Sequence, residues 1–485
     1  MLKKSERGHQ THRREYEQTP LTVDHSMAMA EVVGTANGLS EAELRELAPR
    51  LQRLDEQLQT WRCDGTAGFC ALPYDTAAVQ EIKGLAKRLK EWCRDALVVG
   101  IGGSAWGARA LRQALLHPSH NHFPLGQRHY HSRLFIADNI EPDSLYGMLD
   151  GLELKRTTVN VISKSGETPE TLALFLFIYQ ILENRLGTAQ AKESFVLTTD
   201  GSQGSLSRLA AREGFPHLQV PAGVSGRFAI LSAMGLFPAA LAGIDIDGLL
   251  AGARFMDQRL REAPVTENAA YRLAAIYYLG QRHKGRRVQV IMPYADSLLG
   301  LASWCGHLWA ESLGKQYDSQ GRQVNTGFTT LPARGATDQH TQLQLFLEGP
   351  NDKMVTFWEV GKFQQNITIP PRFADNEGLD YLTGQTLAGL LAAAKQATAW
   401  QLAERGCPNL TIQIPEVNAF TIGQLIYLCQ MTVAALGGLL EIDPFGQPQI
   451  EGLKRIVCGL LGRQGYEAER EALATFSRTM KKYLV

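Results

Sequence analysis

Short β-branched runs alternate with longer amphipathic segments from Ala96 onward. Four apolar runs have the length of buried strands, at residues 97–101, 134–137, 159–162 and 195–198. The longer segments between them carry apolar residues at helical spacing. This alternation predicts βαβ units and therefore a parallel sheet.

A second series of short apolar runs follows the first. These runs occupy residues 288–292, 328–331, 354–357 and 410–414 and are again separated by helical segments. Between the two series lies a long apolar segment, 227–241, which ends at a polar stretch that begins with Gly243. We therefore place a domain boundary near residues 243–265 and expect two α/β units that face each other across a cleft.

The two ends of the chain depart from this alternation. Residues 1–24 are polar and charged and predict an arm, whereas Ser40 and Glu43 form a capping-box pattern at the start of a helix. Residues 465–485 predict a charged helix that packs on the body of the protein or on a second subunit. No fixed period relates the two halves.

Composition narrows the class of protein. The chain has 485 residues, of which 44% are hydrophobic and 20% charged, so it is long and apolar enough for two or three cores. Lysine plus arginine equals aspartate plus glutamate at 49 each, so no overall field favours nucleic acid or an anionic membrane. Any anion must therefore be bound by a local site.

The cysteines and the N-terminus predict a cytoplasmic protein. Seven scattered cysteines without C-x-x-C spacing argue against a disulfide framework and against a zinc ribbon. The first residues lack the apolar core of a signal peptide. We also expect no apolar run long enough to cross a membrane.

Glu311 is our candidate catalytic base. It is an acid within an otherwise aromatic and apolar segment that contains Trp304, Trp309 and Leu313. Apolar walls around its carboxyl would raise the pKa toward the operating pH and make it a better base. The alternative is a surface glutamate near a helix end that is capped by Gly314.

A glycine-rich turn at residues 100–107 follows the first predicted strand. Such a strand-to-helix turn lets backbone amides approach an anion at a helix N-terminus. The alternative is a tight turn that only needs positive φ. The G-x-G-x-x-G spacing of dinucleotide sites is absent.

The segment 163–170 follows the third predicted strand and has the composition of a phosphate cup. Lys164 can act as a point charge, while the hydroxyls of Ser163, Ser165 and Thr168 can take fixed positions around phosphate oxygens. Thr168 is also placed to cap the next helix. A capped turn alone does not explain a lysine between two serines at the carboxyl end of a strand, where doubly wound sheets bind ligands.

Three further residues are candidates for the chemistry. Arg227 is predicted at the N-terminus of the long apolar helix, where an anion or a developing oxyanion is its natural partner; the alternative is a surface arginine. His340 can exchange a proton near neutral pH. Lys454 lies on the first turns of a helix, and its alternative is a solvated lysine. His307 and Glu311 lie four apart, but a zinc site asks for more ligands.

These segments together resemble the phosphoglucose isomerase family, in the family's order and over about Asp64 to Lys454. The matching motifs are Asp64-Gly-Thr-Ala-Gly-Phe, Gly100-Ile-Gly-Gly-Ser, Ser163-Lys-Ser-Gly, Gly226-Arg-Phe, Glu311-Ser-Leu-Gly-Lys, Gly335-Ala-Thr-Asp-Gln-His and Gln447-Pro-x-x-Glu-x-x-Lys454. The resemblance implies isomerisation of glucose 6-phosphate and fructose 6-phosphate in glycolysis and gluconeogenesis. It also implies a homodimer that completes each active site and no metal or organic cofactor.

The resemblance also implies a domain layout with two sugar-isomerase (SIS) type α/β sandwich domains. We expect an N-terminal arm with helices over residues 1–60, a first domain with the phosphate loops over 61–255 and a second domain with the base over 256–455. A C-terminal helical arm would cover 456–485.

Roles follow residue by residue from the same resemblance. Glu311 matches the base that moves a proton between C2 and C1 through a cis-enediol, and Arg227 matches the stabiliser of the enediolate. His340 and Lys454 match the pair that handles ring opening, with His340 expected from the neighbouring subunit. The residues matched to substrate and phosphate binding are Gly103, Ser104, Ser163, Lys164, Ser165, Thr168 and Gln447.

Two positions depart from the family's pattern. His307 stands where a glutamine is usual, so it is expected to contact substrate or Glu311 and to make the rate more sensitive to pH. Glu167 puts a carboxylate in the phosphate loop, where it would repel phosphate unless it points outward; its place at a helix N-terminus offers a structural reason for it.

Two other functions stay open. One is a sugar-phosphate-binding sensor without catalysis, although a sensor has no reason to keep Glu311, Arg227, His340 and Lys454 together. The other is an isomerase that also accepts mannose 6-phosphate, because both sugars converge on one enediol. No segment predicts a DNA-binding helix-turn-helix.

Overall fold

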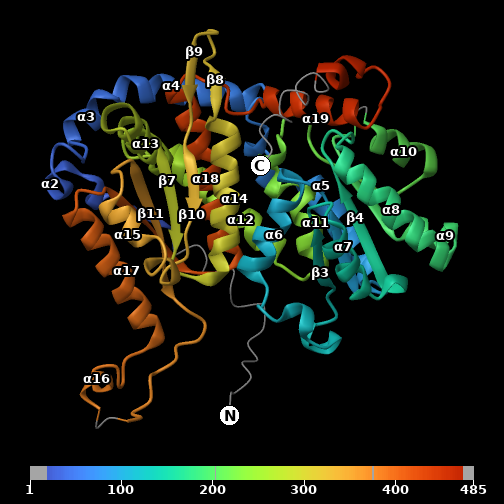
Figure 1. Ribbon diagram of the computed structural model, residues 1–485, viewed down its shortest axis with the longest axis horizontal. Helices are drawn as coiled ribbons and strands as arrows, with labels where there is room; N and C mark the ends of the chain where they lie inside the picture. Colours follow the sequence, from blue (N-terminus) through green and yellow to red (C-terminus); the bar gives the residue numbers. More distant parts are fainter. Residues whose placement is uncertain (1–18, 202–203, 374–375, 473–485) are drawn as a thin grey trace, which may run out of the picture.

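Two sheets lie side by side in the computed structural model, and helices cover both faces of each sheet (Figure 1). The structure describes residues 19–201, 204–373 and 376–472. The alternation of strands and helices in the sequence produces this arrangement, so the predicted pair of α/β units with parallel sheets is confirmed.

The first sheet is parallel throughout. In spatial order its strands are β3 (Arg133–Ala137), β2 (Asp95–Val99), β4 (Thr157–Ile162), β5 (Phe195–Thr199) and β6 (His217–Gln219). The four strands expected from apolar runs are all present, and the short β6 was not predicted. The helices that cover the sheet are α5 (Thr76–Lys90), α6 (Gly103–Leu115) and α11 (Ala233–Leu241) on one face, and α7 (Pro142–Asp150), α8 (Pro169–Leu186), α9 (Thr188–Glu193) and α10 (Ser205–Glu213) on the other.

The second sheet is parallel except at one edge. Its order is β1 (Thr22–Asp24), β12 (Asn409–Glu416), β11 (Lys353–Lys362), β7 (Val288–Pro293) and β10 (Thr329–Pro332), with β1 antiparallel to β12. Its helices are α13 (Ala269–Lys284), α14 (Leu299–Leu313) and α18 (Ala419–Leu439) on one face, and α15 (Leu343–Glu348) and α17 (Leu387–Glu404) on the other. The predicted strands are again present.

The last residues of the expected N-terminal arm form part of the second sheet. Residues 22–24 of that polar stretch pair with β12, which hides an edge of the second sheet. Ser40 and Glu43 form the predicted capping box at α3 (Glu41–Glu46). The elements that complete this end are α2 (Ala30–Val33) and α4 (Ala48–Cys63). Residues 1–18 lie outside the described part of the chain.

Helix α18 corrects the expectation that no apolar segment is long enough to cross a membrane. Its 21 residues meet that criterion by length and composition, yet all of the apolar stretch is buried inside the fold. It packs against α13, α14 and α12 (Ile246–Glu262). Its apolar character on all sides therefore comes from its place at the centre of the core.

Helix α12 crosses the boundary expected between residues 255 and 256. Asp257, in this helix, is 1% exposed and accepts hydrogen bonds from Arg62 Nη2 at 2.6 Å and from the hydroxyls of Tyr427 and Tyr74 at 2.5 and 2.7 Å. This network, centred on the buried Asp257, joins α4, α12 and α18. The segment between the two sheets is therefore part of the shared core, with no linker at residue 255.

Two further parts project from the sheets. A hairpin of β8 (Lys315–Tyr317) and β9 (Gln323–Thr326) follows α14, and a longer projection that contains α16 (Glu377–Asp380) leads into α17 (Figure 1). After α18 the chain continues into α19 (Pro448–Leu460). The charged helix expected over 465–485 is helical from residue 467 to 472, and residues 473–485 lie beyond the described part.

Candidate active site

A cavity of about 430 Å³ opens where the strand order of the first sheet reverses. Strand β2 lies between β3 and β4. The chain leaves β2 toward β3 on one side and leaves β4 toward β5 on the other side, so the loops after β2 and β4 run in opposite directions from one point. Ligands of doubly wound sheets bind at such points. The candidate residues that line the cavity are Gly103, Ser104, Lys164, Ser165, Thr168, Arg227, Glu311, Gln447 and Lys454.

The glycine-rich loop forms one wall of the cavity. It begins after Val99 and ends at α6, where Gly102 has a φ of +58°. A Cβ on Gly103 would lie 2.7 Å from the carbonyl carbon of Gly226. Gly102 therefore allows the positive φ of a tight turn, as in the alternative interpretation. The absence of a side chain at Gly103 also lets the segment of Arg227 pack against the N-terminus of α6.

The serine and lysine loop after β4 forms the opposite wall. Lys164 Nζ donates to the carbonyl of Ala222 at 2.8 Å, and Thr168 is the N-cap of α8 without a capping bond from its side chain. Burial lowers the pKa of Lys164, with nearby Arg227 adding to the effect and Asp200 opposing it. An anion in the cavity would relieve this unfavourable burial of a positive charge.

Ser163 lies behind this wall. It is 1% exposed and is absent from the lining, and its hydroxyl shares a hydrogen bond of 3.0 Å with that of Thr168. Its place in the cup is therefore indirect, because it holds Thr168, which lines the cavity.

Glu167 points away from the cavity. Its Oε1 accepts from the backbone amide and the hydroxyl of Ser205, at 2.7 and 2.6 Å, at the start of α10, and its Oε2 lies 3.3 Å from Arg463 Nη2. Burial favours the neutral acid, but the bonds from Ser205 and the Arg463 guanidinium outweigh burial and lower the pKa of Glu167. The carboxylate that seemed to conflict with phosphate binding thus braces the loop from outside.

Arg227 is buried rather than at the surface. It lies in the 3-10 helix η8 (Gly226–Leu231), and Ser232 separates η8 from α11, so the single long helix expected over 227–241 is wrong. The Nε atom donates to Ser312 Oγ at 2.7 Å, and Nη2 donates to the carbonyls of Pro444 and Gly446 at 2.8 and 3.2 Å. One acceptor from α14 and two from the loop before α19 thus fix the guanidinium.

The remaining nitrogen of Arg227 faces the cavity. Nη1 donates to Gln447 Oε1 at 2.9 Å and lies 3.5 Å from Glu311 Oε2. Burial lowers the pKa of Arg227, and the charges of Glu311 and Asp443 oppose this. The fold therefore fixes a positive charge at the cavity, where Nη1 is the guanidinium nitrogen nearest Gln447 and Glu311.

Glu311 lies in the last turn of α14, and its side chain is 27% exposed. Its neighbours Trp304, Trp309 and Leu313 are buried in the core, whereas its carboxylate faces Arg227 and His307. The prediction that these apolar residues surround the carboxyl is therefore wrong. The helix directs the aromatic side chains into the core and the acid toward the cavity.

The end of α14 is held by Lys315. Its Nζ donates to the carbonyls of Glu311 and Ser312, both at 2.8 Å, and so satisfies acceptors that the helix end leaves open. Burial, assisted by Arg227, lowers the pKa of Lys315 to about 8. The residues after Glu311 in its motif thus fix the backbone that carries the acid.

His307 lies one turn before Glu311 and does not line the cavity. Its Nε2 is buried, lies 3.9 Å from Glu311 Oε1 and has no hydrogen-bond partner among the described residues. Burial lowers the pKa of His307; the nearby Arg227 lowers it further, while Glu311 opposes the shift. The imidazole is therefore neutral at pH 7 and gains a proton only on the acid side.

We expect His307→Gln to flatten the acid side of the pH profile. Protonated His307 would place a second positive charge beside Glu311 and weaken that carboxylate as a base, so kcat should fall as the pH drops below the ordinary histidine range. The ratio of kcat at about pH 8 to kcat at about pH 5.5 should be at least about threefold larger in the wild type than in His307→Gln.

The control for this prediction is His283→Gln. His283 is an exposed histidine of α13 that pairs with Glu43, away from the cavity. Its variant should keep the wild-type pH profile, and an unchanged acid limb in His307→Gln would assign the titration to another group.

Lys454, from α19, lines the cavity, whereas His340 does not. His340 is exposed in the turn after η10 (Thr337–Gln339). Reasoning from the sequence missed Asp200, which lines the cavity at the end of β5 beside Lys164. Its place after a buried apolar run, at the carboxyl edge of the sheet, was the available signal.

Among the described residues, no group of three or more histidine, cysteine, aspartate or glutamate side chains could hold a metal ion. The pair of His307 and Glu311 thus gains no further ligand.

Comparisons with known proteins agree on one family. The profile of the phosphoglucose isomerase family matches residues 81–464. A glucose-6-phosphate isomerase of Rubrobacter xylanophilus is 40% identical over 89% of this chain and 96% of its own length, and one of Carboxydothermus hydrogenoformans is 38% identical over 89% and 93%.

Two solved structures share the fold. A hypothetical protein of Thermus thermophilus has a TM-score of 0.80 and 34% identity, over 91% of this chain and 100% of that one. A glucose-6-phosphate isomerase of Chlamydia trachomatis has a TM-score of 0.71 and 20% identity, over 83% of this chain and 76% of that one.

Proposed function

The chain belongs to the phosphoglucose isomerase family, and we propose that it is an aldose-ketose isomerase that interconverts glucose 6-phosphate and fructose 6-phosphate in glycolysis and gluconeogenesis. One observation carries the proposal beyond the relatives. The Glu311 carboxylate faces the cavity 3.5 Å from the buried Arg227 charge, in a cavity that also contains the phosphate-type loop with Lys164. Acid, fixed cation and anion cup are the groups that this reaction needs.

The phosphate of the sugar is proposed to bind between the two loops of the first sheet. Lys164, Ser165 and Thr168 supply an ammonium and two hydroxyls, and the start of α6 supplies the backbone amide of Gly103 and the hydroxyl of Ser104. This places the charged end of the substrate near α8 and leaves the carbonyl end for α14 and α19. Gln447, held by Arg227, is then proposed to contact the sugar.

Proton transfer is assigned to Glu311. It removes the C2 proton of the open-chain aldose and returns it at C1, so the intermediate is a cis-enediol whose oxygen carries developing negative charge. The Nη1 corner of Arg227 supports this charge, since Nε and Nη2 are used in the fold. Lys454, with His340, is proposed to move the protons of ring opening.

A solvent-exchange experiment tests the reaction type. With EDTA present, the purified protein should convert fructose 6-phosphate to glucose 6-phosphate and, in D₂O, should place deuterium at C2 of the aldose, because a carboxylic acid exchanges its proton with solvent. Mass spectrometry or proton NMR of the product measures the label. Conversion without any label would support hydride transfer and contradict the assignment of Glu311.

The same assay separates the other functions. A sensor would bind both sugar phosphates without turnover, and the retention of Glu311, Arg227 and Lys454 in one cavity supports an enzyme instead. Parallel reactions with mannose 6-phosphate measure whether that epimer is also accepted. Cytoplasmic location is proposed with the function, and the seven free thiols of the chain are consistent with a reducing compartment.

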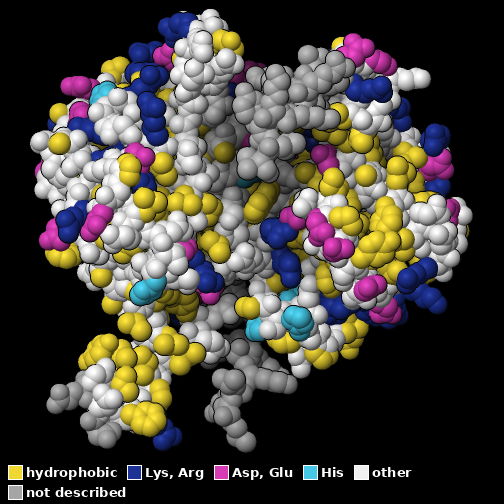
Figure 2. All heavy atoms as spheres, in the orientation of Figure 1, with side chains coloured by type: hydrophobic (Ala, Val, Ile, Leu, Met, Phe, Trp, Pro, Cys, Tyr) yellow, Lys and Arg dark blue, Asp and Glu magenta, His cyan; other side chains and the backbone are white. Residues whose placement is uncertain are grey.

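We propose that the protein acts as a homodimer that completes each active site. The projection before α17 supports this, because it exposes Ile367, Phe373 and Tyr381 by 57, 75 and 71%. Figure 2 shows hydrophobic side chains gathered on the lobe at the lower left, where Figure 1 places α16. A projecting apolar surface of this kind is typical of an interface. His340, exposed and outside its own chain's cavity, is then available to a neighbour.

Mixing two inactive variants tests the shared site. If His340 acts in the partner's cavity, a dimer of one Glu311→Gln chain and one His340→Ala chain has one intact site and one doubly altered site. Random reassortment of equal amounts should then restore about a quarter of the wild-type activity per chain, as follows from a two-fold symmetric dimer. Each variant alone is the control. No recovery after verified subunit exchange would place Glu311 and His340 in the same subunit's site.

A further inference from the structure

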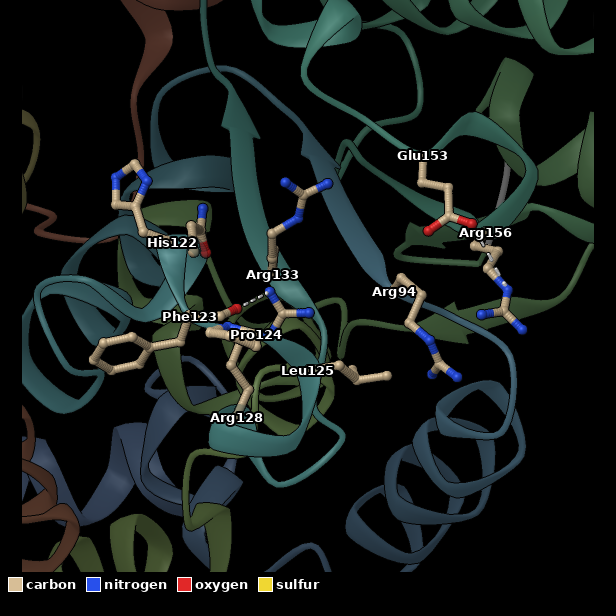
Figure 3. Close-up of a pocket in the computed structure, with 10 residues that line it drawn as sticks. Arg94, His122, Phe123, Pro124, Leu125, Arg128, Arg133, Glu153 and Arg156 are labelled. Atoms are coloured by element: carbon tan, nitrogen blue, oxygen red, sulfur yellow. Dashed lines mark hydrogen bonds and ion pairs between the residues drawn. The ribbon is translucent and has the colours of Figure 1, made fainter. Parts of the chain in front are cut away.

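A second hollow lies at the opposite end of the first sheet, where the strands begin. Its volume is about 450 Å³, and it is lined by Arg94, Arg128, Arg133 and Arg156, with Glu153 as the lining acid (Figure 3). We call this cavity, with its four arginines, the basal hollow. It is separated from the active-site loops by the length of β2 and β4, roughly 15–20 Å.

The sheet itself sets three of these arginines side by side. Arg94 comes directly before β2, Arg133 opens β3 and Arg156 comes directly before β4. The Arg133 amide donates to the carbonyl of Arg94, and the Arg94 amide donates to that of Arg156, both at 2.8 Å. The parallel register therefore concentrates positive charge at the end of the sheet where the strands begin.

The carboxylates nearby neutralise only part of this charge. Asp95, which is fully buried, accepts both Nε and Nη2 of Arg133 at 2.6 Å, and Glu153 lies 4.0 Å from Arg156 and is exposed. Arg94 has no ion pair among the residues that the structure describes; its guanidinium donates to the carbonyl of Cys93 at 3.4 Å. Two cations are thus left without a carboxylate, Arg94 and Arg128.

Arg128 is the strongest sign of a missing anion. Its side chain belongs to the 3-10 helix η6 (Leu125–Arg128), is only 7% exposed and meets two neutral acceptors, the carbonyl of Phe123 at 3.1 Å and that of His131 at 3.2 Å. Within the described part of the chain, its Nη2 has no acceptor. Burial lowers the pKa of Arg128, and the charges of Arg133 and Arg94 lower it further against the opposing Asp95. Burying a charged side chain without a counter-ion costs free energy, so an uncharged residue would suit this position better if it served packing alone.

We propose that the basal hollow is a second anion-binding site, which takes a small molecule with a phosphate or diphosphate group. Guanidinium forks match the geometry of phosphate oxygens, and Arg94, the buried Arg128 and Arg156 all line the hollow, where they can provide several charge-assisted hydrogen bonds. The volume suits a small ligand rather than a polymer. Because β2 and β4 run from Arg94 and Arg156 to the two active-site loops, the ligand would bind together with substrate and would not compete with it.

Calorimetric titration with inorganic pyrophosphate tests the site on the full-length protein. The wild type should bind two pyrophosphate ions per chain, one in each cavity. Arg94→Gln/Arg156→Gln should lose the basal event, with Kd raised at least about tenfold, because two charge-assisted contacts are removed. Lys164→Gln should instead weaken the active-site event and keep the basal one. This assay requires no catalysis, so its failure leaves the isomerase proposal untouched.

A charge-matched variant separates a site from a general field. Arg88→Gln/Lys155→Gln removes the same charge from exposed positions outside the hollow and should titrate like the wild type. The proposal is overturned if the wild type binds one ion that Lys164→Gln abolishes, if Arg94→Gln/Arg156→Gln keeps both events, or if the charge-matched control weakens the basal event equally. Should the double variant not fold, Arg156→Gln alone, altered at an exposed position, gives the same test.

Discussion

Glu311→Gln is expected to lower kcat for fructose 6-phosphate isomerisation by at least about 10³-fold, with KM changed little. Glutamine keeps the size of the side chain but cannot accept a carbon-bound proton. The fold should be unaffected, because Arg227 retains Ser312, Gln447 and the two backbone carbonyls as acceptors. A coupled assay gives kcat, and thermal melting gives the fold.

Two variants calibrate this loss. Glu311→Asp keeps the carboxylate but withdraws it from the substrate, and a displacement of this size costs about 10²-fold in kcat. Glu170→Gln alters another acid that lines the cavity and should change kcat far less. If Glu311→Gln retained kcat within about tenfold of the wild type, the proton would have to pass through a different base.

The sheets could be predicted because their signals are local. Each buried parallel strand is a short β-branched run, and the length of the intervening segment sets the helix. The strand β1 was missed because its three residues carry no apolar run and it gains its structure from β12, almost four hundred positions away. The break at Ser232 was missed for a related reason: apolar residues on both sides of it gave one uniform pattern over 227–241.

The active-site chemistry was predictable in kind but less so in its surroundings. The cup around Lys164 could be predicted because a lysine between two serines follows a buried strand, and doubly wound sheets bind ligands at the carboxyl ends of their strands. The environment of Glu311 did not follow, because neighbours in sequence on a helix point in different directions: Trp309 enters the core while the acid faces Arg227. Glu167 shows the same limit, since its partner Ser205 lies on another helix.

Arg227→Met is expected to reduce both stability and rate. The free energy of unfolding should fall by about 2–4 kcal/mol, because the carbonyls of Pro444 and Gly446 lose their donor in a buried place. At a temperature where the variant is still folded, kcat should remain reduced about 10²–10³-fold, because the cavity has lost the charge that faces the enediolate. Denaturant unfolding and steady-state kinetics measure the two effects separately.

The two roles of Arg227 can be separated because different nitrogens carry them. Ser312→Ala removes only the acceptor of Nε, so it should cost about 1–2 kcal/mol of stability while Nη1 still faces the cavity and kcat stays within about tenfold. Arg227→Lys keeps a positive charge without the fork, so it should recover part of kcat but little stability. A folded Arg227→Met protein with kcat within about threefold of the wild type would limit Arg227 to structure. The enediolate would then need its stabilising charge from another cation of the cavity, such as Lys454.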